Sequence, residues 1–182
     1  MIITLSGLPG SGTSTVARTL ADMLQLEVVS AGDMFRDMAR ERGLSLEEFG
    51  KLAELDPKID KMIDERQVEI AKEKDNVLIE GRLSGWMVDA DIKIWLKASV
   101  ESRCERVASR EGMSFEQALR DAKEREACEA KRYTEFYKID INDLSPYDLV
   151  IDSSKWDRDG VVEILYASIK ALGDKNESRD AC

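Results

Sequence analysis

A glycine-rich segment directly after the first apolar run constrains this sequence more than any other feature. Residues 2–6 form a short apolar run bounded by glycine, which is typical of a strand buried on both faces. From Thr13 to Leu24, apolar residues recur at helical spacing. Between these elements, three glycines within six residues allow the backbone N–H groups to turn inward. The segment therefore predicts a strand, a phosphate-binding loop and a helix whose positive end faces the phosphate.

The loop departs from the usual phosphate-binding pattern, G-x-x-x-x-G-K-[ST], at one position. Thr13 stands where the pattern has lysine, and Ser14 stands where a hydroxyl binds Mg²⁺. We therefore expect the loop to lack one positive charge beside the β- and γ-phosphates of ATP. Arg18, one helical turn further along, and arginines later in the chain are candidate substitutes. The predicted ATP-binding residues are Gly7, Leu8, Pro9, Gly10, Ser11, Gly12, Thr13, Ser14 and Thr15.

Apolar runs alternate with helical stretches along the rest of the chain. We predict strands at 26–29, 76–79, 92–96 and 149–151, and helices at 33–42, from 45, and at 57–73, 100–111, 114–131 and 161–172. The alternation predicts an α/β fold, a five-stranded parallel sheet flanked by helices, in one domain of residues 1–172 with a polar tail at 173–182. Ligands bind beyond the carboxyl ends of such strands, which here carry Gly7, Ser30, Glu80, Lys97 and Asp152.

Composition argues against several classes of function. Lys and Arg number 27 against 37 Asp and Glu, a net charge of −10, which disfavours a nucleic-acid or anionic-membrane surface. The chain has no histidine, so imidazole catalysis and His-ligated metals are excluded. Cys104, Cys128 and Cys182 show no CxxC spacing, and the N-terminus is typical of a strand rather than a signal peptide. We expect a monomeric, cytoplasmic protein without a disulfide framework or a membrane span.

Two arginine-bearing motifs follow predicted strands. After the second strand, Ser30, Gly32 and Asp33 lead to Arg36, whose guanidinium can bind a phosphate through two hydrogen bonds. After the third strand come Glu80, Gly81 and Arg82. The acidic residue can hold Mg²⁺ through water, the glycine clears space, and the arginine can reach a second phosphate. Each motif alone is also compatible with an ordinary surface turn or helix start.

Six arginines lie within thirty residues of the second half: Arg103, Arg106, Arg110, Arg120, Arg125 and Arg132. Interleaved glutamates make a solvated helix face the simplest explanation for Arg103 and Arg120. Arg125 and Arg132 are seven positions apart and therefore share one helix face. We expect this pair to lie on a mobile lid that closes over the transferring phosphoryl group.

Taken together, these segments resemble the nucleoside monophosphate kinases, and within them the archaeal branch of the cytidylate kinases. The resemblance covers residues 1–172. It rests on the loop with threonine for lysine, on S-x-G-D-x-x-R after the second strand, on Glu80-Gly81-Arg82, on Glu124-Arg125 with Arg132, and on D-x-x-I-D-[ST]-S at residues 148–154. Bacterial cytidylate kinases differ in carrying lysine at the Thr13 position and a serine near Ala31.

The resemblance implies a kinase that transfers the γ-phosphate of ATP, bound with Mg²⁺, to CMP or dCMP. Helices at about 31–73 would bind the acceptor, and about 110–140 would form the lid. The implied catalytic residues are Arg36, Arg82, Arg125 and Arg132; the implied acceptor-binding residues are Ser30, Gly32, Asp33, Arg36, Gly81 and Arg82; Ser14 and Glu80 would serve the metal. The acceptor oxygen is already anionic, so alignment and charge neutralisation suffice without a general base.

Two alternatives stay open at this point. One is a kinase of the same fold for UMP, AMP or a small metabolite, and the other is a nucleotide-binding module that lost catalysis with its lysine. Cytosine offers an amino donor and two acceptors, which suits a carboxylate beside an amide or arginine. Asp60, Asp64 and Gln67, with Arg66 close by, are candidate base readers, although a solvated helix face is the simpler explanation for them.

Overall fold

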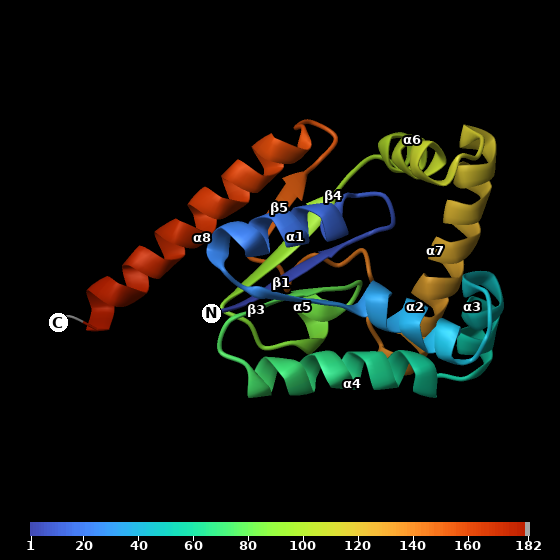
Figure 1. Cartoon of the computed structure of the whole chain (residues 1–182), viewed down its shortest axis with the longest axis horizontal. Helices are drawn as coiled ribbons and strands as arrows, with labels where there is room; N and C mark the ends of the chain where they lie inside the picture. Colours follow the sequence, from blue (N-terminus) through green and yellow to red (C-terminus); the bar gives the residue numbers. More distant parts are fainter. Residues whose placement is uncertain (181–182) are drawn as a thin grey trace.

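A five-stranded, all-parallel sheet forms the centre of the protein. The computed structural model describes the backbone of residues 1–180 and the side chains of residues 1–173. The strands are β1 (Ile2–Gly7), β2 (Glu27–Ser30), β3 (Val77–Glu80), β4 (Ile92–Lys97) and β5 (Leu149–Asp152), in the order β2-β3-β1-β4-β5 (Figure 1). The predicted fold class is confirmed, because short apolar runs between amphipathic helices leave a buried parallel sheet as the natural arrangement.

Helices cover both faces of this sheet. On one face, α1 (Thr13–Leu24) and α8 (Arg158–Asp180) pack together over β1 and β4, where Leu5, Leu20 and Leu165 are fully buried. On the other face, α4 (Lys58–Glu73) and α5 (Ser84–Met87) cover β3, with Ile70 and Ile79 buried between them. Burial of these aliphatic faces holds the layers together.

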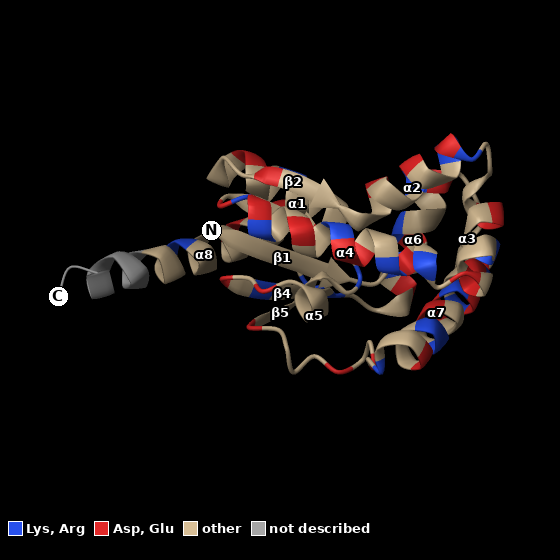
Figure 2. Cartoon of the chain, turned by 90° about the horizontal axis from the view of Figure 1, so that it is seen from below, with Lys and Arg blue, Asp and Glu red and all other residues tan. Residues whose placement is uncertain are grey.

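The remaining helices surround the carboxyl end of the sheet. On one side lie α2 (Ala31–Glu41), α3 (Leu46–Leu55) and the start of α4, which cover the range expected to bind the acceptor. On the other side α6 (Val100–Glu111) leads into α7 (Phe115–Tyr137), which crosses the rim until its last turns reach α4 (Figure 1). Figure 2 shows basic and acidic residues interleaved along α7. This rim is where the strand ends, the phosphate-binding loop and both sets of helices meet.

Several predicted boundaries were wrong. The second helix begins at Ala31 rather than 33, because the Ser30 hydroxyl accepts the Asp33 N–H and so caps the helix two residues earlier. The seventh continues to Tyr137 rather than 131, and four-residue α5 is too short to show a helical period in sequence. The last helix runs from Arg158 to Asp180, so the predicted tail at 173–182 is helical over its described part.

Two further expectations concern the cysteines and the membrane. Cys104 and Cys128 are free thiols, and Cys182 lies outside the described residues. Within residues 1–180, none of the helices combines the length and the apolar character that crossing a bilayer requires.

Candidate active site

The glycine-rich loop takes the geometry that its sequence predicts. Gly10 and Gly12 adopt φ values of 84° and 96°, in the left-handed region that favours glycine. The Ser11 N–H donates to the Leu8 carbonyl over 3.1 Å and closes a tight turn. Gly12 is the N-cap of α1, and no side chain satisfies the first N–H groups of that helix. The loop therefore leads into a bare helix N-terminus, which attracts anions.

Glu80, the last residue of β3, lies at the base of this loop among hydroxyl groups. Thr13 Oγ1 donates to Glu80 Oε1 over 2.7 Å, and Ser14 Oγ donates to the same oxygen over 3.2 Å. Ser30 Oγ donates to Glu80 Oε2 over 2.6 Å. The carboxylate is only 4% exposed, and these hydroxyls solvate it in place of water. The residue at the lysine position is thus turned toward Glu80 and helps to bury that charge.

Gly81 and Arg82 continue from this point. A Cβ at Gly81 would lie 2.6 Å from Ser84 Oγ and 2.8 Å from the Ala31 Cβ, so the predicted need for glycine here is confirmed by a close approach of three segments. Arg82 Nη1 donates to the carbonyl of Gly7 over 2.9 Å, which ties the end of β3 to the start of the loop.

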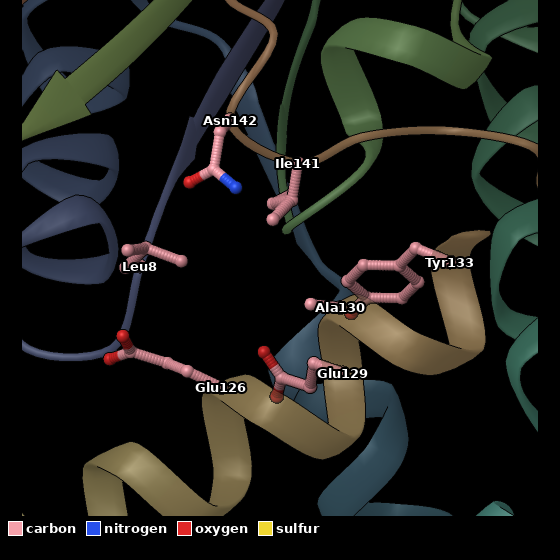
Figure 3. Close-up of a pocket in the computed structure, with 7 residues that line it drawn as sticks. All are labelled: Leu8, Glu126, Glu129, Ala130, Tyr133, Ile141 and Asn142. Carbon is pink, nitrogen blue, oxygen red and sulfur yellow. The ribbon is translucent and has the colours of Figure 1, made fainter.

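Two arginines, Arg82 after β3 and Arg125 on α7, share the carboxylate of Glu129 on α7. Arg82 Nε lies 3.2 Å from one oxygen of Glu129 and Arg125 Nε lies 2.8 Å from the other. Burial alone would raise the pKa of Glu129, but the charges of Arg82, Arg125 and Arg132 outweigh it and hold the pKa below its usual range. Figure 3 shows Glu126 and Glu129 facing a cavity of about 130 Å³, which is also lined by Leu8, Ala130, Tyr133, Ile141 and Asn142. The structure thus brings Arg82 and Arg125 together on one carboxylate, whereas Arg132, which the sequence groups with Arg125, pairs with Asp60.

A row of hydrogen bonds between polar side chains joins α4 to α7. Arg132 Nε donates to Asp60 over 2.8 Å, and Tyr137 OH donates to Asp64 over 2.7 Å. Gln67, only 1% exposed, donates from Nε2 to Asp64 over 3.3 Å. Burial raises the pKa of Asp64 to about 6, although the Tyr137 hydrogen bond partly offsets this effect. The solvated face is wrong for Asp60, Asp64 and Gln67, whose side chains contact α7 or α5. Arg66, in contrast, is exposed and pairs with Glu69 on its own helix.

Gln67 in turn has a fixed orientation. Its Oε1 accepts from Ser84 Oγ over 2.6 Å, at the end of the sheet beside Gly81. The Asp64 carboxylate only accepts, so it selects the amide nitrogen as its partner and sets which way the amide points.

Arg36 lies on the open side of the rim. Its Nη2 donates to Asp33 Oδ1 over 2.5 Å, and Arg18 Nη2 lies 3.4 Å from the other oxygen of the same carboxylate. The hydrogen bond from Arg36 is the main cause that lowers the pKa of Asp33. Arg18, a candidate for the missing loop cation, therefore faces the acceptor side and pairs with Asp33. A Cβ at Gly32 would make only ordinary contacts, so no close approach requires that glycine.

The explanation of Arg103 as a solvated residue is wrong. Its side chain is 5% exposed and contacts Glu126, the Ala98 carbonyl and the Pro9 carbonyl of the loop. Arg120 is exposed and pairs only with its helix neighbour Gln117, as expected. Interleaved Glu residues made the whole run resemble a surface face, and only α6 packing against the loop separates the two arginines.

Sequence reasoning also missed Glu129 and Ser153. Glu129 lies midway between Arg125 and Arg132 at i+4 spacing from the first, a signal that was present but was read as ordinary surface pairing. Ser153 follows β5, and its Oγ donates to the Ser11 carbonyl over 2.8 Å. No local pattern distinguishes it from the serine beside it.

The parallel sheet, the loop between β1 and α1 and the rim of arginines define the class of P-loop kinases. Solved structures support the fold: an uncharacterized protein from Eubacterium ventriosum has a TM-score of 0.70 at 20% identity, with 93% of this chain and 98% of that one covered. A shikimate kinase from Bacteroides thetaiotaomicron has a TM-score of 0.61 at 12% identity, covering 93% and 98%. At such identities the likeness establishes the fold alone.

Sequence comparison identifies the family within this class. Residues 2–155 match the model of the cytidylate kinase-like family, and the chain belongs to that family. It is 57% identical to a cytidylate kinase of Pyrococcus abyssi, covering 96% of this chain and 97% of the relative. It is 53% identical to a cytidylate kinase of Methanococcoides burtonii, covering 95% and 99%. The predicted resemblance to cytidylate kinases of the archaeal branch is confirmed.

Proposed function

We propose that this chain transfers the γ-phosphate of ATP to CMP, giving ADP and CDP. Relatives named cytidylate kinase are similar over nearly the full length of both chains. The structural observation that carries the proposal is the sharing of Glu129 by Arg82 and Arg125 beside the loop. Guanidinium groups gathered on one carboxylate at the end of a parallel sheet can exchange that partner for phosphate oxygens.

The donor side is the loop from Gly7 to Thr15. Its turned-in N–H groups and the uncapped N-terminus of α1 would hold the triphosphate. Ser14 Oγ and the Glu80 carboxylate would hold Mg²⁺, directly or through water, since both are hard oxygen ligands of the kind this ion prefers. When bound, the ion would neutralise negative charge on the triphosphate. A cavity of about 320 Å³ beside the loop, lined by Gly12, Arg106 and Trp156 among others, has room for the rest of the donor.

The acceptor side is the rim around Gly32 and Gly81. Arg36 and Arg82 would bind the acceptor phosphate, with Ser30 and Asp33 fixing the start of α2 between them. Arg82 is held in place from both ends, by the Gly7 carbonyl and by Glu129, and therefore loses little freedom when a phosphate arrives.

The lid contribution would come from α7. Arg125, whose side chain is 59% exposed, and Arg132 would turn toward the transferring phosphoryl group as substrates bind. Closure excludes water, so that ATP is not simply hydrolysed, and the added charge is supplied only in the complete complex. Alignment and charge neutralisation then account for catalysis without a general base, which suits a chain without histidine.

The acceptor base would be read by the row on α4. Cytosine presents an amino donor at N4 beside an acceptor at N3. The Asp64 carboxylate would accept from N4, and the Nε2 of Gln67, which donates to Asp64 and to the Ile63 carbonyl, would exchange one of these partners for N3. Uracil presents the opposite order, an acceptor at O4 beside a donor at N3. The fixed orientation of Gln67 prevents it from adapting to uracil, so the pair favours CMP over UMP.

An acceptor panel tests the proposal. Purified protein with ATP and Mg²⁺ is assayed for ADP release with CMP, dCMP, UMP and AMP. We expect the highest kcat/KM with CMP. A higher value with UMP or AMP would assign the fold to another acceptor, and ATP binding without acceptor-dependent turnover would indicate a binding module.

A further inference from the structure

The side chain of Thr13 leaves the triphosphate site without the ammonium group that most loops of this type carry. Its hydroxyl is turned to Glu80 and its side chain is buried. Glu80 adds a negative charge at the base of the loop. The loop must nevertheless attract a polyanion, so positive charge has to reach it from outside the motif.

Arg106 of α6 supplies such a charge at the outer surface of the loop. Its Nη1 lies 3.3 Å from the Gly10 carbonyl and 3.4 Å from the Ser11 carbonyl. The same side chain donates to the Ser153 carbonyl over 2.6 Å and to its hydroxyl over 3.0 Å. Among the described side chains, no carboxylate lies within ion-pair distance of Arg106, so its charge is opposed only by neutral oxygens.

Arg103, one turn earlier on α6, contacts the preceding carbonyl of the loop. Its Nη1 lies 3.2 Å from Pro9 O, and Gly10 approaches so closely that a Cβ there would lie 2.5 Å from the Arg103 carbonyl. Unlike Arg106, Arg103 forms a bidentate ion pair with Glu126. Arg103 therefore adds little net charge and acts by holding the loop in shape.

These contacts also orient the loop amides. A trans peptide unit points its C=O and its N–H in opposite directions. Because Arg103 draws the Pro9 carbonyl outward and Arg106 draws the Ser11 carbonyl outward, the N–H groups of Gly10 and Gly12 point the other way. Side chains of α6 thus impose from outside the arrangement that a phosphate needs inside.

We propose that Arg106 is the cation that takes over the charge of the absent loop lysine, and that Arg103 is a positioning residue that holds the loop open for phosphate. The inference rests on the proposed function for its donor, ATP, but concerns a different part of the site from acceptor choice. It assigns to α6 a role that the loop motif itself performs when it contains lysine.

The first test is a split between donor and acceptor kinetics. Arg106→Gln should raise the KM for ATP roughly tenfold, the effect of about 1.4 kcal/mol, while the KM for CMP stays within about twofold. Arg106→Lys keeps the charge and should stay within about threefold of the unmodified protein. Arg40→Gln is the matched control, because Arg40 lies on α2 with a 79% exposed side chain. Thermal unfolding of each variant verifies that it is folded.

The second test separates charge from contact with the donor base. Binding of inorganic tripolyphosphate, which has no base, is measured by calorimetry beside ATP. Equal weakening of both ligands in Arg106→Gln supports the proposal. Weakening of ATP alone would assign Arg106 to the base and overturn it, as would no weakening at all. This measurement needs no CMP turnover, so it stands even if the acceptor panel contradicts the proposed function.

The third test returns the lysine. Adding Thr13→Lys to Arg106→Gln should recover most of the lost affinity for tripolyphosphate, because one loop cation replaces another. A double variant no better than Arg106→Gln would show that Arg106 does not stand in for the lysine.

For Arg103, we expect Arg103→Gln to lower kcat and raise the KM for ATP, with partial rescue in Arg103→Lys. Equal loss in Arg103→Lys and Arg103→Gln, together with lowered thermal stability, would reduce Arg103 to a structural residue.

Discussion

Arg82 and Glu129, which stand 47 positions apart in the sequence, form an ion pair of 3.2 Å that joins the end of β3 to the middle of α7. Glu129 is buried, the Arg82 side chain is 19% exposed, and Arg82 also donates to the carbonyl of Gly7, the first glycine of the loop. The pair therefore connects the phosphate-binding loop, the acceptor rim and the lid helix. Loss of either partner should lower both the free energy of unfolding and kcat.

Substitution of Arg82 tests its role at the transferring phosphate. Arg82→Ala leaves Glu129 buried with fewer cations, so we expect it to lower the free energy of unfolding by about 3 kcal/mol as well as to reduce turnover. Arg82→Lys keeps the charge but loses the two-pronged donor, and should reduce kcat roughly 100-fold with a much smaller loss of stability. Steady-state kinetics and denaturant unfolding measure the two effects. Near-normal kcat in folded Arg82→Lys would remove Arg82 from the site.

Glu129→Gln should make the protein depend on added anions. The variant keeps one acceptor oxygen for Arg82 or Arg125, replaces the other by an amide NH2 that cannot accept from a guanidinium, and loses the negative charge that balances these groups. We expect a lower melting temperature in buffer without phosphate, and a larger rise than in the unmodified protein when phosphate or CMP is added. Differential scanning calorimetry with and without phosphate, at concentrations on the order of millimolar, measures the two melting temperatures. Glu65→Gln on the exposed face of α4 is the control, and equal responses of both variants would contradict the prediction.

Asp64→Asn should weaken the choice of CMP over UMP. The substitution keeps the shape but places an amide where cytosine N4 needs an acceptor, so we expect the ratio of kcat/KM for CMP to that for UMP to fall roughly tenfold or more. The loss should lie mainly in the KM for CMP. Unchanged preference in a folded Asp64→Asn protein, alongside normal CMP turnover by the unmodified chain, would exclude Asp64 as a base reader without affecting the proposed reaction.

The same carboxyl predicts a pH dependence of acceptor choice. Burial raises the pKa of Asp64 to about 6, with Asp60 on its own helix adding to the effect and Tyr137 of α7 and Gln67 opposing it. Below that pH the group is protonated and becomes a donor, so the KM for CMP should rise as pH falls through about 6. The Asp64→Asn variant should lack this inflection. A profile with the same inflection in both proteins would assign it to another group.

Protonation of Asp64 should affect the stability of the fold and the binding of CMP in opposite directions. Because its folded pKa is raised, the folded state binds more protons between pH 3.8 and about 6, and this contribution to stability is lost as pH rises through that window. At neutral pH the ionised carboxylate therefore destabilises the fold, and Asp64→Asn should increase the free energy of unfolding by about 2 kcal/mol. Urea unfolding at pH 7 and pH 4.5 measures the difference, which should shrink at the lower pH. A gain of the same size at both pH values would contradict this account.

Much of the fold could be predicted because its signals are local. Every predicted strand matches a strand within one residue at each end, since short apolar runs bounded by turns leave little choice of register. The loop, Glu80 and Gly81 could be predicted because they stand at the end of a strand, where ligands bind, and Ser14 because it occupies the hydroxyl position of the loop pattern. The end of α7 and the four-residue α5 were missed, because contacts with other elements rather than local periodicity hold them.

The sequence by itself determined the class of sheet, the phosphate-binding loop and the absence of its lysine. Only the tertiary structure decided which arginine serves which purpose, because six similar residues interleaved with glutamates look alike along the chain. Packing buries Arg103 against the loop, leaves Arg120 in solvent and turns Arg82 toward Glu129. The electrostatic interaction between two charges depends on the distance between them in space, and the crossing of α6 and α7 over the strand ends sets those distances.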